Sequence, residues 1–171
     1  MPPLTRPGDG FSSVFVGISI RLSGEGAPMS DVVDRMLAAM NDHDIDAVLR
    51  CFAPDAVVVG PELEAGNPDE IASYILQIWE GFPDLRLLLW GRVGHGDALA
   101  TELLATGTHR GPYLIADGQV LEATGRFTTL RVSWFWQIAN DLVVSQRYYY
   151  DQLELYAQLG LRMPLTFDPT G

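Results

Sequence analysis

Four long segments with the composition of β-strands occupy the second half of this chain. We place them, after the helix-stopping Pro83, at 85–93, 98–110, 126–138 and 142–150. β-Branched and aromatic residues suit the pleated surface of a sheet, and turns as short as Asn140-Asp141 join antiparallel strands. The sequence therefore predicts an antiparallel meander.

Helical periodicity dominates the chain before Pro83. Apolar residues recur at helical spacing in three stretches, and Asn67-Pro-Asp-Glu70 is a strong helix start, with a cap residue, a proline and two acids. We expect helices at 32–40, 44–52 and 67–82, a strand at 56–59 and a terminal helix beginning near Gln152. Helices followed by a meander indicate an α+β fold, in which the helices cover one face of a curved sheet.

The chain divides into an extension and one domain. Residues 1–28 are rich in Pro, Gly and Ser, and only 14–20 has the composition of a short strand. We assign no function to this extension. The rest of the chain, 29–171, is long enough for one domain with a full hydrophobic core.

Composition restricts the partners of this protein. A formal net charge of −11 argues against nucleic acid and against an anionic membrane, because both attract basic surfaces. A small apolar or polycyclic ligand is compatible with this charge. No apolar run reaches the ~18 residues of a transmembrane helix, and the N-terminus lacks a signal-peptide pattern, so we expect a cytoplasmic protein.

Residue usage also restricts the chemistry. All 11 basic residues are arginine, and the lack of lysine excludes a Schiff-base mechanism. The single Cys51 rules out an intramolecular disulfide and a cysteine-based zinc site. The three histidines share no metal-ligand spacing, and phosphate-binding and dinucleotide-binding motifs are missing from the sequence. We therefore expect no metal and no cofactor.

Asp151 is the first candidate for a catalytic group, because it ends the segment 142–150 directly before the terminal helix. An inward-pointing carboxylate at this place is poorly solvated, which raises its pKa and makes it a better proton acceptor. The alternative is that Asp151 caps the helix beginning near Gln152, and from the residues alone the cap is the commoner role.

His109 is the best partner for Asp151, because an imidazole titrates near neutral pH. It lies in Gly107-Thr-His-Arg-Gly-Pro112 at the end of a strand. A structural histidine at the rim of the domain is the alternative. We interpret His43 and His95 as solvated side chains.

The segment Leu130–Gln137 predicts a sheet that is apolar on both faces. Successive side chains of a strand point to opposite faces. Val132, Trp134 and Trp136 therefore share one face, and Ser133, Phe135 and Gln137 share the other. One face should meet the helices and enclose a cavity, and the other should pack against a second copy in a homodimer. The pattern does not tell which face is which.

Five motifs in this order resemble the SnoaL-like polyketide (ester) cyclase family, over roughly residues 30–162. They are Phe82-Pro-Asp-Leu85, Gly107-Thr-His-Arg-Gly111, Ala123-Thr-Gly-Arg126, the turn Asn140-Asp141, and Tyr150-Asp151 ahead of Gln158-Leu-Gly160. The resemblance implies an NTF2-like cone, a curved antiparallel sheet wrapped on N-terminal helices. It also implies cofactor-free ring closure of a polyketide by intramolecular aldol condensation, with Asp151 taking a proton from carbon.

Two departures from the family pattern limit what carries over. Gln137 lies on the strand where the family's cyclases have a histidine, and Glu122-Ala123 replaces a proline pair. His109 is then the imidazole left to protonate an oxyanion. The wider superfamily includes isomerases, hydroxylases, epoxide hydrolases and noncatalytic binding proteins, so a carrier of small molecules is the alternative to an enzyme.

The side chains expected to bind substrate beside the catalytic Asp151 and His109 are Trp79, Arg126, Phe135, Trp136, Gln137 and Tyr149. Four of the six are aromatic, as a polycyclic apolar ligand requires.

Overall fold

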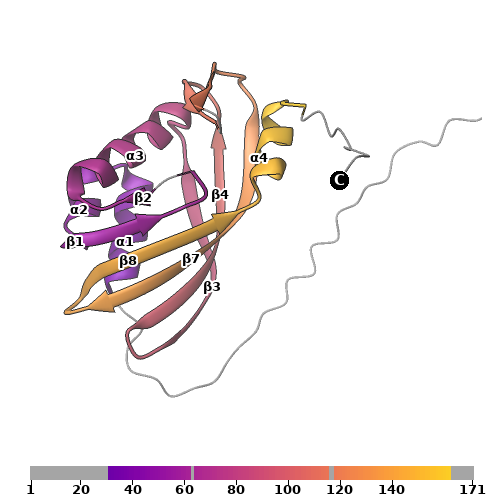
Figure 1. The fold of residues 1–171 in the computed structure, drawn as a ribbon. Helices are drawn as coiled ribbons and strands as arrows, with labels where there is room; N and C mark the ends of the chain where they lie inside the picture. The colour runs from indigo at the N-terminus through magenta and orange to yellow at the C-terminus, as the bar shows by residue number, and fades with distance from the viewer. Residues whose placement is uncertain (1–30, 63, 116–117, 163–171) are drawn as a thin grey trace, which may run out of the picture.

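A computed structural model describes residues 31–62, 64–115 and 118–162, so the extension 1–28 lies outside the described residues (Figure 1). The helices are α1 (Asp31–Asp42), α2 (Ile45–Leu49), α3 (Pro68–Gly81) and α4 (Gln152–Leu159). The strands are β1 (Phe52–Val59), β2 (Glu64–Ala65), β3 (Arg86–His95), β4 (Ala98–Thr108), β5 (Tyr113–Leu114), β6 (Val120–Leu121), β7 (Phe127–Ala139) and β8 (Leu142–Tyr150).

The predicted α+β fold with a curved sheet is confirmed. One sheet has the strand order β2-β1-β8-β7-β4-β3, and the predicted meander β3-β4-β7-β8 is antiparallel throughout. Helices α1, α2 and α3 lie over one face of this sheet, and α4 follows β8 at one end (Figure 1). The buried apolar side chains lie between the helices and the sheet, where Met36, Ile71 and Leu103 are at most 2% exposed.

The strand at the start of the sheet differs from the prediction. We expected a helix through Phe52, but α2 ends at Leu49 and β1 already begins at Phe52, which pairs with Val143. A short apolar run does not distinguish a helical turn from the start of a strand. β1 also pairs in parallel with β8, an arrangement that the meander did not predict.

The two faces of β7 have different surroundings. Val132, Trp134 and Trp136 are buried at 7%, 8% and 3% exposure, whereas Phe135 is 45% exposed. The indole Nε1 of Trp136 donates to the Thr101 hydroxyl at 3.0 Å, so this buried polar group is satisfied. The face of Trp134 and Trp136 is therefore the inner face, and Phe135 lies on the outer face.

No helix within the described residues is long and apolar enough to cross a membrane.

Candidate functional site

An apolar cavity lies between the helices and the inner face of the sheet. It consists of two hollows of about 70 and 120 Å³. They adjoin, because Met40, Tyr74, Ile78, Trp134 and Tyr148 line both. Leu155 of α4 lines the larger hollow, so the terminal helix closes one end. Such an interior suits a small apolar ligand.

Four phenols line this cavity, together with the polar side chains of Thr106, Thr128 and Gln146. Tyr74 comes from α3, Tyr113 from β5, and Tyr148 and Tyr150 from β8. Burial raises the pKa of each of these phenols above its usual value. All four are therefore neutral at physiological pH and act as hydrogen-bonding groups rather than as bases.

Hydrogen bonds join these phenols in two places. The hydroxyls of Tyr148 and Tyr74 hydrogen-bond to each other, and both residues line both hollows. The Tyr150 hydroxyl donates to Oε1 of Glu62, in the segment between β1 and β2, and Gln152 Nε2 donates to the same oxygen at 2.7 Å. A carboxylate thus lies beside the phenols.

His109 is fully buried behind the wall of the cavity. Its ring packs against Phe82 and Tyr113, with centroid distances of 5.2 and 6.2 Å, and both of these side chains line the larger hollow. Burial lowers the pKa of His109, an effect that the backbone of Gly111 partly opposes. The imidazole is therefore neutral near pH 7.

The hydrogen bonds of His109 determine its tautomer. The backbone N–H of Thr124 donates to Nδ1 at 3.2 Å, so Nδ1 carries no hydrogen and Nε2 carries the proton. Nε2 is buried, and no acceptor among the described residues forms a hydrogen bond of ordinary geometry with it. The Gly111 backbone nevertheless favours a proton on the ring, so Nε2–H faces a weak acceptor rather than none.

Asp151 has an exposed side chain and caps α4. Its Oδ1 accepts a hydrogen bond from the backbone N–H of Glu154 at 3.1 Å. The capping alternative from the sequence is therefore observed. Asp151 itself lines neither hollow, although the neighbouring Tyr150 and Leu155 both line the larger one. Its second carboxylate oxygen has no hydrogen-bond partner within the described part of the chain.

The six predicted substrate-binding residues do not gather around the interior cavity. Phe135, Gln137 and Tyr149 lie on the outer face of the sheet, because neighbours of inward-pointing residues on a strand point outward. Arg126 is exposed and its Nη1 donates to the Gln158 carbonyl at 3.4 Å. Trp79 and Trp136 are buried, but neither lines the interior cavity.

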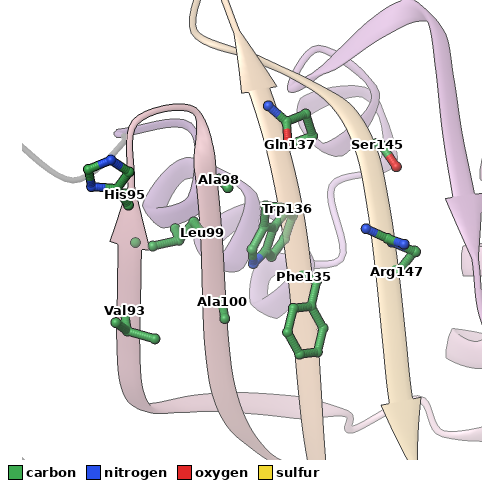
Figure 2. Close-up of a pocket in the computed structure, with 11 residues that line it drawn as sticks. Val93, His95, Ala98, Leu99, Ala100, Phe135, Trp136, Gln137, Ser145 and Arg147 are labelled. Atoms are coloured by element: carbon green, nitrogen blue, oxygen red, sulfur yellow. The ribbon is translucent and has the colours of Figure 1, made fainter.

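A third hollow, of about 330 Å³, lies on the outer face (Figure 2). Phe135 and Arg147 are cross-strand neighbours on β7 and β8, with Gln137 and Ser145 farther along the same two strands. Val93 and His95 of β3 form the opposite side. This outer groove is open and lies on the opposite side of the sheet from the phenols.

The sequence analysis missed the phenol cluster and Glu62. Tyr148 and Tyr150 share the inner face with Trp134 and Val132, their cross-strand partners, but this assignment requires the register of β7 against β8. Alternation alone leaves the two faces equivalent. Glu62 has no signal in the local sequence, because only the folded sheet brings it to Tyr150.

Comparison with known proteins identifies the family. The family model described as a SnoaL-like domain matches residues 33–146, two thirds of the chain. The chain belongs to the SnoaL-like domain family. This SnoaL-like protein matches no curated protein in sequence.

Solved structures share the fold of this SnoaL-like protein at low identity. AclR from Streptomyces galilaeus, a proposed hydroxylase, is 22% identical with a TM-score of 0.65, over 75% of this chain and 92% of its own. IdmH from Streptomyces antibioticus, a proposed polyketide cyclase, is 23% identical with a TM-score of 0.64. The match covers 77% of this chain and 97% of IdmH. A protein of Catenulispora acidiphila with a ketosteroid isomerase-like fold is 16% identical with a TM-score of 0.67. The match covers 81% of this chain and 99% of that protein. These likenesses support the NTF2-like α+β fold.

Proposed function

We propose that this protein is a cofactor-independent acid–base enzyme of the cyclase and isomerase type, acting on a small apolar or polycyclic carbonyl compound. The observation that carries the proposal is an apolar interior cavity whose polar groups are neutral hydrogen-bond donors. Neutral donors in a water-poor site stabilise an enolate as its charge develops. Membership of the SnoaL-like family and the fold shared with a proposed polyketide cyclase support the same chemistry.

The proposed reaction begins with loss of a proton from the carbon next to a carbonyl. The C–H bond breaks, the proton moves to a carboxylate, and the electron pair moves onto the carbonyl oxygen as an enolate. In ring closure, the enolate carbon then forms a C–C bond with a second carbonyl, whose oxygen takes up a proton. The Tyr74–Tyr148 pair retains one hydroxyl hydrogen outside its mutual hydrogen bond, and this hydrogen can bind the enolate oxygen.

Asp151 is the proposed proton acceptor. Its position directly after Tyr150, which lines the cavity, and its second carboxylate oxygen, which no described residue binds, support this role. Asp151→Asn keeps the shape and removes the base. We expect deuterium exchange of β-tetralone in heavy water, followed by nuclear magnetic resonance, to slow by about 100-fold or more.

The matched control for this variant is Asp55→Asn, an exposed aspartate on β1, which should exchange at the wild-type rate. Exchange by Asp151→Asn within a few-fold of wild type would contradict the assignment of Asp151.

His109 is the proposed donor to the oxygen that develops negative charge. Its Nε2–H, which forms no hydrogen bond of ordinary geometry within the described residues, supports this role, and its ring packs against Phe82 and Tyr113 of the cavity wall. His109→Gln should lower turnover by about tenfold or more while the protein remains folded. A change in stability alone would make His109 a structural residue.

A noncatalytic carrier of small molecules is the second candidate. The predominance of aromatic over titratable side chains in the cavity favours it. Titration with polycyclic aromatic ketones separates the two functions. Tight binding without product, unchanged in Asp151→Asn, would support the carrier, and product formation would exclude it.

We also propose that the protein is a homodimer joined through the outer face of the sheet. Leu88, Phe135 and Tyr149 are 59%, 45% and 56% exposed on this face. Soluble monomers rarely expose several large apolar side chains on one face.

A further inference from the structure

Two pairs of polar groups in the interior cavity differ in the ligand atoms they can bind. The hydroxyls of Tyr74 and Tyr148, which line both hollows, share one hydrogen bond. Two hydroxyls carry two hydrogens, so one O–H remains free whichever of them donates. This pair therefore offers a hydrogen to an acceptor such as a carbonyl oxygen.

The pair of Tyr150 and Glu62 offers the opposite polarity. The hydrogen of the Tyr150 hydroxyl is committed to Glu62, because an ionised carboxylate only accepts hydrogen bonds. Gln152 Nε2 donates to the same carboxylate oxygen at 2.7 Å and holds it in place. The Tyr150 oxygen has two lone pairs, and the Tyr113 hydroxyl interacts with one of them. The other lone pair can bind a donor of the ligand.

The charge of Glu62 strengthens this acceptor. No arginine or histidine forms a salt bridge with Glu62 among the described residues. Its negative charge is one of the causes that raise the pKa of Tyr74, Tyr113, Tyr148 and Tyr150, so it acts on all four phenols. A hydrogen bond that leads through a phenol to a carboxylate is polarised and is stronger than one that ends at a neutral phenol.

We propose that Tyr150 and Glu62 form a subsite that accepts a hydrogen bond from a hydroxyl group of the ligand, either a phenol or an enol. The ligand then lies with its hydroxyl at Tyr150 and its carbonyl at the Tyr74–Tyr148 pair. This subsite rests on the proposed function only in taking the interior cavity as the ligand site. It deepens that function by naming the substrate group that is recognised at Tyr150.

The test compares β-naphthol with its methyl ether, which has the same rings but lacks the hydroxyl hydrogen. Calorimetric titration of the whole chain should show that β-naphthol binds about tenfold or more tightly than the ether. Glu62→Gln and Tyr150→Phe should reduce this ratio to within about twofold. The ether should bind each variant as it binds wild type, because it has no hydrogen to donate.

Glu64→Gln is the matched control, an exposed glutamate two residues along the chain, and should retain the wild-type ratio. Equal affinity of wild type for the two compounds, no binding of either, or an unchanged ratio in a folded Glu62→Gln would overturn the subsite. If Glu62→Gln does not fold, Tyr150→Phe decides the matter in the same way. Binding needs no turnover, so a retained preference for the hydroxyl without deuterium exchange would refute only the proposed reaction.

Discussion

The buried imidazole of His109 couples folding to pH. Its pKa in the folded state is lowered by burial, so the unfolded chain binds a proton first as the pH falls. The stability that His109 contributes is therefore complete above the unfolded pKa of about 6.5 and is lost as the pH falls toward the lower folded value.

We expect the free energy of unfolding of wild type to decrease between about pH 8 and about pH 5.5, by at most about 1.4 kcal/mol per pH unit from this group. His109→Gln should be less dependent on pH over the same interval. Urea denaturation of both proteins at the two pH values measures the difference. Identical pH dependence would show that His109 does not titrate with folding.

Gly60 determines the position of a cavity phenol. A Cβ at this position would lie 1.9 Å from Cζ of Tyr148, so the ring would have to move. Gly60→Ala should push the ring into the cavity, cost about 1–3 kcal/mol of stability, and weaken β-naphthol binding. Gly66→Ala is the control, because nothing lies within 4 Å of a Cβ there. Wild-type stability and binding in Gly60→Ala would contradict this account.

At the scale of elements, Asp151 at the start of α4 has two roles: it caps the helix, and it is the proposed proton acceptor. Asp151 caps the helix through its side chain, and asparagine caps nearly as well as aspartate, whereas alanine does not. Asp151→Ala should lose about 1 kcal/mol of stability, and Asp151→Asn should stay near wild type.

Urea denaturation of both Asp151 variants measures the contribution of the cap to the free energy of unfolding, separately from any effect on catalysis. A proton-accepting role predicts that both substitutions slow deuterium exchange by about 100-fold or more, while only the alanine variant is destabilised. Equal stability of the two variants would show that the cap contributes little.

At the scale of the whole molecule, the outer face of the sheet determines assembly. Light scattering at micromolar concentration should give twice the 18.8 kDa mass of the chain. Phe135→Glu places a buried charge in the proposed interface and should shift the protein to a monomer. Leu76→Glu, on an exposed helix position of 49% exposure, should leave the dimer intact. A monomeric wild type would refute the interface.

Much of the architecture was predictable from local patterns. The helical spacing before Pro83, the Asn67 start of α3, and the turn at Asn140-Asp141 each depend on residues close together in the chain. Local propensity and periodicity encode such elements directly, and their order indicates the α+β fold. The family motifs pointed to the SnoaL-like domain for the same reason, since they are contiguous in sequence.

The composition of the site depended on tertiary structure. Alternation along β7 and β8 separates two faces, but only the helices packed on one of them decide that Tyr148 and Tyr150 point inward and that Phe135, Gln137 and Tyr149 point outward. Glu62 is far from Tyr150 in sequence, and the pairing of β1 with β8 brings the segment after β1 close to the end of β8. Contacts between distant segments depend on register and packing, which no local pattern contains. The sequence by itself therefore determined the long helices, the four strands of the meander, the fold class and the family. The tertiary structure decided where β1 begins and which side chains share the cavity.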